Sequence, residues 1–237
     1  MTVKQRCFVR SARWINGLSL FVLGFGILGR SVAIAQTTAA DYRQMGLAYR
    51  QAGNFPEAIA ALQEAVNLAP DDVNGRVLLG WTQHLAGDSD AAMQTLRDTV
   101  YLDPLSVETA NALGIVYLVR NDLSDAVLVH TWAALLKSDN EIAYYNLSLA
   151  YEQMGRYDWA IATGERATEL EPWNPHPWVA LAIAHWSNGD VKQAQEIYRQ
   201  AIAVDGRYTD AAFLDYLTEA AFSPEQIERA KTVLNAT

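Results

Sequence analysis

The feature that most constrains the fold of this chain is an internal repeat with a period of 34 residues. One column of the repeat is alanine at every step: Ala58, Ala92, Ala126, Ala160 and Ala194. A second column holds Gly53, Gly87, Asn121, Gly155 and Gly189. A third column holds Pro70, Pro104, Ser138, Pro172 and Gly206. Three columns in register over five steps indicate a stack of similar units, each of which contacts its neighbours.

Each column has a physical role in a helical hairpin. Glycine or asparagine directly after a helix accepts the left-handed backbone that ends it. Alanine lets the two helices of one hairpin cross closely, and proline ends a hairpin because it cannot continue a helix. In the first unit, Tyr42 and Tyr49 follow helical spacing, and Asn54 and Pro56 have the residue types of an N-cap and a first helical turn. The units are expected at residues 39–72, 73–106, 107–140, 141–174 and 175–208.

These columns resemble the tetratricopeptide repeat (TPR) family over residues 39–208. A further point of resemblance is a column of small residues in the first helix: Gly46, Gly80, Gly114, Ser148 and Ala182. The resemblance implies an all-α, right-handed solenoid of about five helix-turn-helix repeats, with the first helix of each unit lining the concave surface.

Four residues depart from the family pattern. Arg76 and Gln83 in the second unit, His130 in the third and Gly164 in the fourth replace large apolar or aromatic residues. Glycine inside a helix costs about 1 kcal/mol relative to alanine. We therefore expect the third and fourth units to be less rigid than the others.

Residues 209–237 are expected to form a degenerate sixth unit. Residues 209–221 read as another first helix, with Phe213, Leu214 and Leu217 as its apolar positions. Ser223 and Pro224 have the residue types of an N-cap and first helical position, and an amphipathic helix should run from there to about residue 235. This pair lacks the glycine and proline columns, and it should cover the open end of the stack.

The first 35 residues have the layout of a secretory signal. Residues 4–13 are basic, residues 14–29 are uncharged and mostly apolar, and Ala33 and Ala35 form an Ala-x-Ala motif. Cleavage is expected between Ala35 and Gln36. An uncleaved anchor is the alternative, although a spanning helix needs about 20 apolar residues. In both cases the basic end stays in the cytoplasm, so the repeats are expected outside it, in a periplasm or lumenal space.

Charge and cysteine content exclude several classes of function. The chain has 18 basic and 27 acidic residues; five of the basic ones lie in residues 1–35, which leaves 13 against 27, a net charge of −14. An acidic body repels phosphate backbones, so nucleic acid is not expected as a partner. The only cysteine, Cys7, lies in the leader, so no disulfide is expected in the repeats.

No arrangement of residues points to catalysis. His84, His130, His176 and His185 do not form an HExxH motif or accompany carboxylates at metal-ligand spacing. The sequence has no GxSxG motif, glycine-rich phosphate loop or GxGxxG motif. We expect no catalytic residue, cofactor or metal site, and therefore no enzyme.

The candidate site is the concave surface. Its inward positions, read by register, are Arg43, Leu47, Arg50, Val77, Trp81, His84, Asn111, Ile115, Leu118, Tyr145, Leu149, Glu152, His176, Val179, Ile183 and Trp186. Phe213 and Leu217 continue this mostly apolar trough. Trp81 and Trp186 exceed what hairpin packing requires, which favours an open groove. Two alternatives are burial of these side chains by a tight superhelix and filling of the trough by the chain's own C-terminal helix.

The resulting functional hypothesis is a non-enzymatic scaffold, exported or tethered to a membrane by its N-terminal segment. It would bind an apolar or amphipathic protein segment, and the family resemblance suggests assembly or maintenance of a membrane or envelope complex. The alternative is a structural module that self-associates into a homo-oligomer. One family subclass binds chaperone tails through a clamp of Lys, Asn and Arg, but here Leu47, Leu78, Glu108 and Ala112 occupy clamp positions and only Arg43 remains. Chaperone-tail binding of that kind is not expected.

Overall fold

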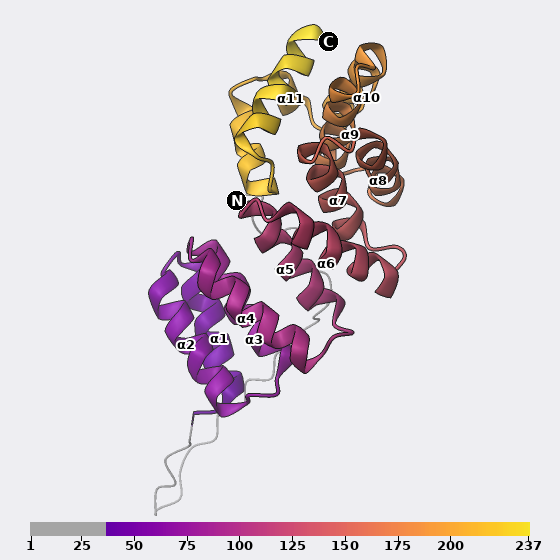
Figure 1. Ribbon diagram of the computed structural model, residues 1–237. Coiled ribbons are helices and arrows are strands. Elements are labelled where there is room, and N and C mark those ends of the chain that lie inside the picture. Colours follow the sequence, from indigo (N-terminus) through magenta and orange to yellow (C-terminus); the bar gives the residue numbers. More distant parts are fainter. Residues whose placement is uncertain (1–36) are drawn as a thin grey trace, which may run out of the picture. The chain divides into compact units, whose positions relative to one another are not determined.

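The computed structural model describes residues 37–237 of the chain. The predicted leader and its cleavage site lie outside the described residues. Residues Thr38–Thr237 form one compact unit, and its regular structure is entirely helical (Figure 1). None of the helices in residues 37–237 is both long enough and apolar enough to cross a membrane.

Five helical hairpins follow one another along the chain. Their first helices are α1 (Ala39–Gln51), α3 (Val73–Leu85), α5 (Val107–Val119), α7 (Glu141–Gln153) and α9 (Pro175–Ser187). Their second helices are α2 (Phe55–Leu68), α4 (Ser89–Leu102), α6 (Leu123–Leu136), α8 (Tyr157–Leu170) and α10 (Val191–Val204). Each helix packs against its hairpin partner and against the next helix along the chain, which confirms the predicted solenoid.

The turns inside the hairpins confirm the role assigned to the glycine column. Gly53, Gly87, Gly155 and Gly189 all have positive φ angles, between 69° and 91°. At the remaining step, Asn121 adopts the same left-handed backbone with φ of 65°. Asparagine tolerates this conformation better than other residues with a Cβ atom, so all five turns close alike. Asn54 does precede α2, but its side chain makes no capping hydrogen bond.

In the first three hairpins, a glycine on the first helix faces a larger residue on the second. A Cβ atom on Gly46 would lie 2.6 Å from Cγ of Leu62, and one on Gly80 would lie 2.7 Å from Cγ of Leu96. In the third hairpin, the imidazole of His130 takes the place of leucine above Gly114 and is fully buried. In these three hairpins the helices therefore cross at a distance that only a glycine on the first helix permits.

The fourth hairpin reverses this arrangement. Gly164 lies on the second helix, and a Cβ atom there would meet Oγ of Ser148 at 2.9 Å and Cδ1 of Leu181 at 3.2 Å. The Ser148 hydroxyl donates a hydrogen bond of 2.8 Å to the carbonyl oxygen of Ala160. Neighbouring side chains thus occupy the space beside Gly164, and both Ser148 and Gly164 are buried.

The C-terminal segment differs from the expected sixth unit. The prediction of a first helix over residues 209–221 is wrong, because two 3₁₀ helices, η2 (Gly206–Thr209) and η3 (Phe213–Ala220), occupy this region. With three residues per turn, η3 places Leu214 and Leu217 on one face, and both are buried. Ala221 then ends η3 in the left-handed conformation.

The last helix begins where the sequence predicts. In α11 (Pro224–Ala236), the Ser223 side chain accepts from the backbone of Gln226, and the Gln226 side chain accepts from the backbone of Ser223. This capping box satisfies two backbone donors at the start of the helix. The helix packs against α9, α10 and η3, and Ile227, Ala230 and Val233 face this contact as buried residues.

Candidate functional site

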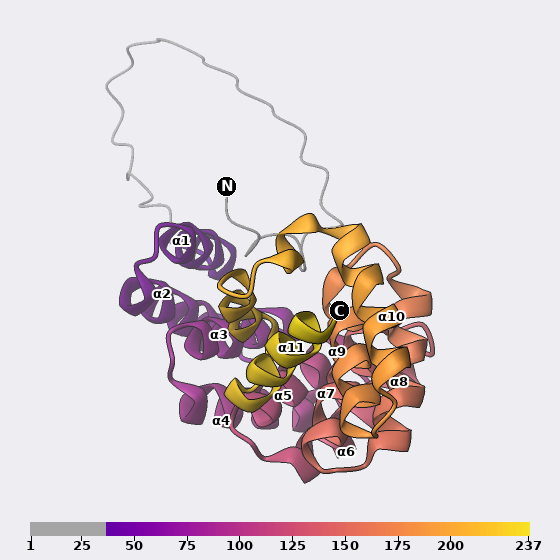
Figure 2. The ribbon, with the colours of Figure 1, turned by 90° about the horizontal axis from the view of Figure 1, so that it is seen from above.

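The candidate site is the inner surface formed by the first helices of the hairpins. Successive first helices α3, α5, α7 and α9 contact one another directly, so their side chains share a continuous face. Figure 2 shows α11 on the inner side of this arc, whereas α4, α6, α8 and α10 lie on its outer side. The C-terminal segment therefore covers part of the surface that the sequence marks as a groove.

Aromatic contacts hold this segment against α7 and α9. The Tyr145 hydroxyl donates a hydrogen bond to the carbonyl oxygen of Ala220, and the Tyr145 ring lies 6.1 Å from that of Phe222 between centroids. The ring of His176 lies 6.5 Å from Tyr145 and 6.3 Å from Tyr208. Burial lowers the pKa of His176 to about 4, so this imidazole is neutral at neutral pH.

A carboxylate anchors the beginning of α11. The side chain of Glu152 is only 1% exposed and forms an ion pair with Arg229. It also accepts hydrogen bonds from Ser187 Oγ at 2.7 Å and Gln226 Nε2 at 2.9 Å. The same Gln226 nitrogen donates to the carbonyl oxygen of Leu149 at 3.0 Å. A buried carboxylate is stable only when hydrogen bonds and an opposite charge replace its water shell, and residues from α9 and α11 provide both here.

The C-terminal half of the predicted groove is thus filled by the chain itself. Leu149, Val179 and Ile183 are fully buried and belong to the same apolar cluster as residues of η3 and α11. Trp186 packs against that cluster as a half-buried side chain. The sequence allows three states of the trough: an open groove, burial by a tight superhelix, and filling by the C-terminal helix. In the fourth and fifth units the C-terminal segment fills the trough and packs on the predicted site residues.

Several predicted residues in the N-terminal half serve packing. Val77 and Leu118 are 5% and 3% exposed. Arg43 forms an ion pair with Asp72. Other buried side chains pair in the same region: the Asn111 amide exchanges hydrogen bonds of 3.1 and 2.9 Å with the Asn140 amide. Val77 and Leu118 are therefore part of the core, and the polar groups of Arg43 and Asn111 have hydrogen-bonding or charged partners within the fold.

The remaining five predicted residues are partly exposed, and we refer to them as the N-terminal inner face: Leu47, Arg50, Trp81, His84 and Ile115. Trp81 and His84 lie side by side, with ring centroids 5.1 Å apart. The Nδ1 atom of His84 is buried and makes no hydrogen bond within the described residues. Burial lowers the pKa of His84, so its imidazole is neutral at neutral pH.

Arg50 is the charged member of this face. Its guanidinium makes one long hydrogen bond, 3.4 Å from Nη1 to Oγ1 of Thr82. No carboxylate of residues 37–237 lies within 4.0 Å of it, and burial lowers the pKa of Arg50 from its ordinary value. Arginine remains charged under any ordinary condition, so Arg50 is a partly desolvated cation for which residues 37–237 supply no compensating anion.

Sequence reasoning missed an apolar region on the outer side of the arc. We call it the outer apolar patch, and it consists of Tyr101, Leu105, Leu128, Trp132 and Leu135, which are 42% to 80% exposed. The Trp132 indole donates to the carbonyl oxygen of Pro104 at 2.8 Å, which holds the ring beside an apolar hollow of about 240 Å³. Comparison along the repeat columns could have revealed it, because Trp132 aligns with Asp98 and Arg166 in neighbouring units.

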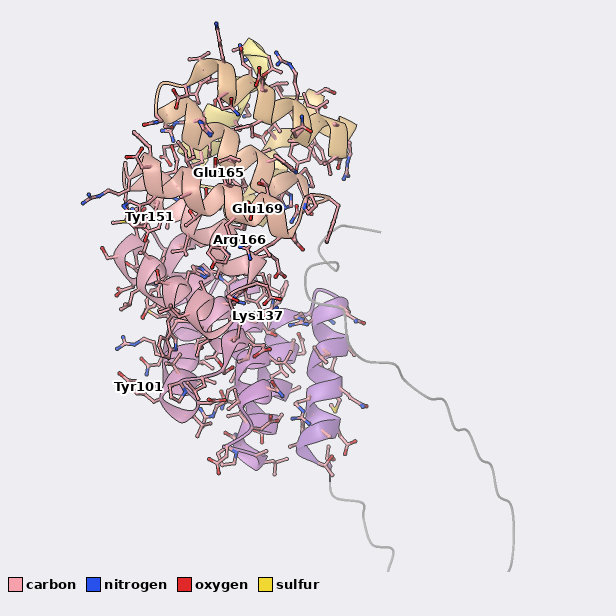
Figure 3. All side chains as sticks on the ribbon, turned by 90° about the vertical axis from the view of Figure 1, so that its right-hand side faces the viewer. Tyr101, Lys137, Tyr151, Glu165, Arg166 and Glu169 are labelled. Atoms are coloured by element: carbon pink, nitrogen blue, oxygen red, sulfur yellow. The ribbon has the colours of Figure 1, made fainter. Side chains whose placement is uncertain are left out.

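The outer side of the fourth and fifth units carries more charged side chains, although Trp159 of α8 is 62% exposed there. Figure 3 shows Glu165, Arg166 and Glu169 projecting from α8. Arg166 and Glu169 form an ion pair of 2.9 Å. An open depression of about 1100 Å³ beside α8 is lined by charged residues, by Trp178 and His185, and by apolar residues such as Leu181 and Ile197. Residues 37–237 contain no group of three or more metal-ligating side chains.

Comparison with solved structures supports the architecture. The crystal structure of MamA superposes with a TM-score of 0.63 and 25% identity, over 71% of this chain and 92% of that chain. MamA of Desulfovibrio magneticus RS-1 gives a TM-score of 0.65 at 21% identity, over 73% and 97% of the two chains. TTC0263, a thermophilic TPR protein of Thermus thermophilus, gives 0.59 at 20% identity over 84% and 100%. The latter two likenesses concern the fold alone.

Curated relatives match over shorter stretches. The heat-shock protein cognate (HSC) co-chaperone sgt12 of Aspergillus fumigatus is 29% identical over 93 residues, which cover 39% of this chain and 27% of that protein. The small glutamine-rich tetratricopeptide repeat-containing protein 2 of Saccharomyces cerevisiae is 25% identical over 117 residues, covering 49% and 34%. This chain therefore spans about a third or less of the length of these relatives.

Profiles of the repeat itself match most of the described residues. A tetratricopeptide repeat profile matches residues 43–107 and 111–175, and a second such profile matches residues 151–214. The matched regions coincide with the five hairpins and their 34-residue period. The chain therefore belongs to the tetratricopeptide repeat family.

Proposed function

We propose that this chain is a non-enzymatic scaffold that binds a segment of a partner protein on the N-terminal inner face. TPR proteins generally mediate protein–protein interactions, which sets the class of function. The observation that carries the proposal is the chain's own C-terminal segment on α7 and α9. The inner surface of this solenoid holds a polypeptide in one half, and the other half has the same mixture of aromatic, apolar and charged side chains.

The physical basis of binding would be burial of apolar area around Trp81. Its indole is partly exposed beside His84, with Leu47 and Ile115 on the neighbouring first helices. Tryptophan is among the residues that most often dominate binding energy, because it buries a large area with few rotatable bonds. An apolar or amphipathic segment would therefore gain most of its affinity at this position.

Cross-linking in the native cell, followed by purification of the tagged protein, tests this proposal. The variant Trp81→Glu should lose a partner that the parent captures, because a carboxylate replaces the apolar anchor. The matched control is Trp173→Glu, since Trp173 is 70% exposed in the loop before α9. Circular dichroism should show that both variants are folded. Equal capture by the parent and by Trp81→Glu would reject the N-terminal inner face as the binding surface.

The proposal includes export of the repeats from the cytoplasm. It rests on the basic, apolar and Ala-x-Ala segments of residues 1–35. Mass spectrometry of the protein from native cells would find a chain beginning at Gln36 if the leader is cleaved. A full-length chain in the membrane fraction would favour the anchor, and a full-length chain in the soluble cytoplasm would reject export. If the repeats are exported, the cross-linking experiment should capture a partner that belongs to a membrane or envelope complex.

Self-association is a second candidate, favoured by the outer apolar patch. This patch contains five exposed large apolar side chains, of which Leu128 and Trp132 line the apolar hollow, and exposed apolar surface of this kind often lies in an interface. Sedimentation velocity over a range of concentrations would detect a homo-oligomer, and Leu128→Glu should dissociate it. A concentration-independent monomer would reject this candidate and leave the scaffold proposal unaffected.

A further inference from the structure

The twelfth position of each first helix forms one column along the inner surface. Its members are Arg50, His84, Leu118, Glu152 and Trp186, which follow one another at intervals of 34 residues. Because the hairpins repeat, side chains of this column project from equivalent places on successive helices. The column carries a cation in the first unit and an anion in the fourth.

Glu152 shows how this column recognises a polypeptide. Its carboxylate pairs with Arg229 and accepts a hydrogen bond from Gln226, both of which belong to the segment lying across the inner surface. The charge of the segment is thus opposite to the charge of the column at the point of contact. Such complementarity selects a partner and its register even where its net energetic contribution is modest.

Arg50 occupies the equivalent position in the first unit, carries the opposite charge, and has no partner charge among residues 37–237. Its only hydrogen bond within the described residues is the long one to Thr82, and no carboxylate lies within 4.0 Å. Two other half-buried arginines in the repeats have such partners: Arg43 pairs with Asp72, and Arg120 pairs with Asp90 and Asp122. Arg76, which is also half-buried, makes no ion pair within the described residues but donates a hydrogen bond of 2.6 Å to the carbonyl oxygen of Pro70. A partly desolvated guanidinium gains most from a carboxylate, which it can engage with two parallel hydrogen bonds.

We propose that the partner segment carries an acidic side chain that pairs with Arg50, next to a large apolar side chain that packs on Trp81. This inference rests on the proposed function, because it specifies the chemistry of the segment bound at the N-terminal inner face. The neutral imidazole of His84 beside Trp81 adds apolar surface without a competing charge. The net negative charge of the repeats repels acidic segments. The positive charge of Arg50 offsets this repulsion locally, so an acidic segment would bind beside it.

Selection from a random-peptide library on the purified full chain tests this inference. Peptides selected by the parent should be enriched in Asp and Glu next to Trp, Phe, Leu or Ile. Arg50→Glu should lose the acidic enrichment and acquire a preference for Lys and Arg. The matched control is Arg97→Glu, because Arg97 is an exposed side chain of α4 without an ion pair within the described residues. This control should keep the acidic preference.

Titration of one selected acidic peptide gives a second measurement. Arg50→Ala should weaken binding by about tenfold to a hundredfold, the range for a charged hydrogen bond. Arg50→Lys should recover part of the affinity, and added salt should weaken the parent more than Arg50→Ala.

The outcomes separate this inference from the proposed function. If selected peptides are apolar without acidic enrichment, yet lose binding in Trp81→Glu, the acidic partner is rejected and the scaffold proposal stands. If Trp81→Glu, Arg50→Glu and Arg50→Ala all bind the same peptides as the parent, both the acidic partner and the scaffold proposal are rejected, because binding then lies elsewhere. Circular dichroism of every variant excludes unfolding as the cause of a loss.

Discussion

The Nε2 atom of His130 lies 2.5 Å from the point where a Cβ atom would stand on Gly114. The two residues face each other across the third hairpin, and His130 is fully buried. Glycine on α5 and histidine on α6 therefore depend on each other, because the ring fills the volume that the missing side chain leaves. This pairing explains why a residue type that is unusual for a helical core is accommodated here.

The first prediction concerns the close contact itself. Gly114→Ala should reduce the free energy of unfolding by about 1 to 3 kcal/mol, because the added methyl group overpacks the crossing. Urea denaturation measures the effect. Gly206→Ala is the matched control, since no atom lies within 4 Å of a Cβ there and the change should be nearly neutral. Additive effects of Gly114→Ala and His130→Ala in the double variant would contradict the proposed coupling.

The second prediction concerns acid stability. Burial lowers the pKa of His130 to about 3, against an ordinary value of 6.5, and the nearby Gly114 backbone opposes this only partly. Between these two pH values the unfolded chain binds a proton that the folded chain does not, so stability falls as the pH drops below 6.5 and this loss continues to about pH 3. The loss from this residue should be about 3 kcal/mol near pH 4.5.

His130→Leu isolates that contribution. Leucine occupies the equivalent position in the first and second hairpins, at Leu62 and Leu96, so it should fit above Gly114. Urea denaturation at several pH values should show a shallower acid loss in the variant than in the parent. The buried His176 remains in both proteins and keeps some acid sensitivity. Parallel stability profiles of the two proteins would exclude His130 as a cause.

The third prediction concerns the anchor of α11. Arg229→Ala removes the charge that compensates the buried Glu152, although Ser187 and Gln226 still donate to this carboxylate. Local stability of residues 224–236 should fall by about 2 kcal/mol. Hydrogen exchange should accelerate there and in α9, while α1 and α2 exchange as in the parent. Lys231→Ala is the control, because its ion pairs with Asp215 and Glu228 involve exposed carboxylates.

The fourth prediction uses the backbone at Ala221. This residue has φ of 65°, a conformation that costs about 1 kcal/mol or more for an ordinary L-residue. Ala221→Gly should therefore stabilise the protein by up to about 1 kcal/mol, less the greater freedom of glycine in the unfolded chain. Asn121→Gly should change stability less, since asparagine tolerates this conformation. If Ala221→Gly destabilises the protein, packing of the Ala221 methyl group contributes more than the left-handed backbone conformation costs.

The hairpins could be predicted because their determinants are local. Gly53 and its counterparts end first helices through their own backbone preference, and Asn121 fills the missing step for the same reason. His130 and Gly164 depart from the repeat pattern when each position is compared only with its own column. Their partners, Gly114 and Ser148, lie 16 residues earlier on the facing helix, and the fit depends on the volumes of both residues.

The C-terminal segment could not be predicted in the same way. Its course depends on contacts between residues far apart in the sequence, such as Tyr145 with Ala220 and Glu152 with Arg229. Apolar spacing at Leu214 and Leu217 suits a 3₁₀ helix as well as an α-helix, so local pattern did not decide between them. Repeat register predicts which residues face the inner surface. It does not predict that the C-terminal segment covers half of them, because this depends on contacts in three dimensions.

The position of α11 also bears on how the protein is made. A ribosome releases the N-terminus first, so the hairpins containing α7 and α9 leave it before the residues that cover their inner surfaces. During that interval the apolar side chains of Leu149, Val179 and Ile183 have no cover from their own chain. Docking of the C-terminal segment, rather than formation of the repeats, is thus the event that closes this half of the solenoid to other polypeptides.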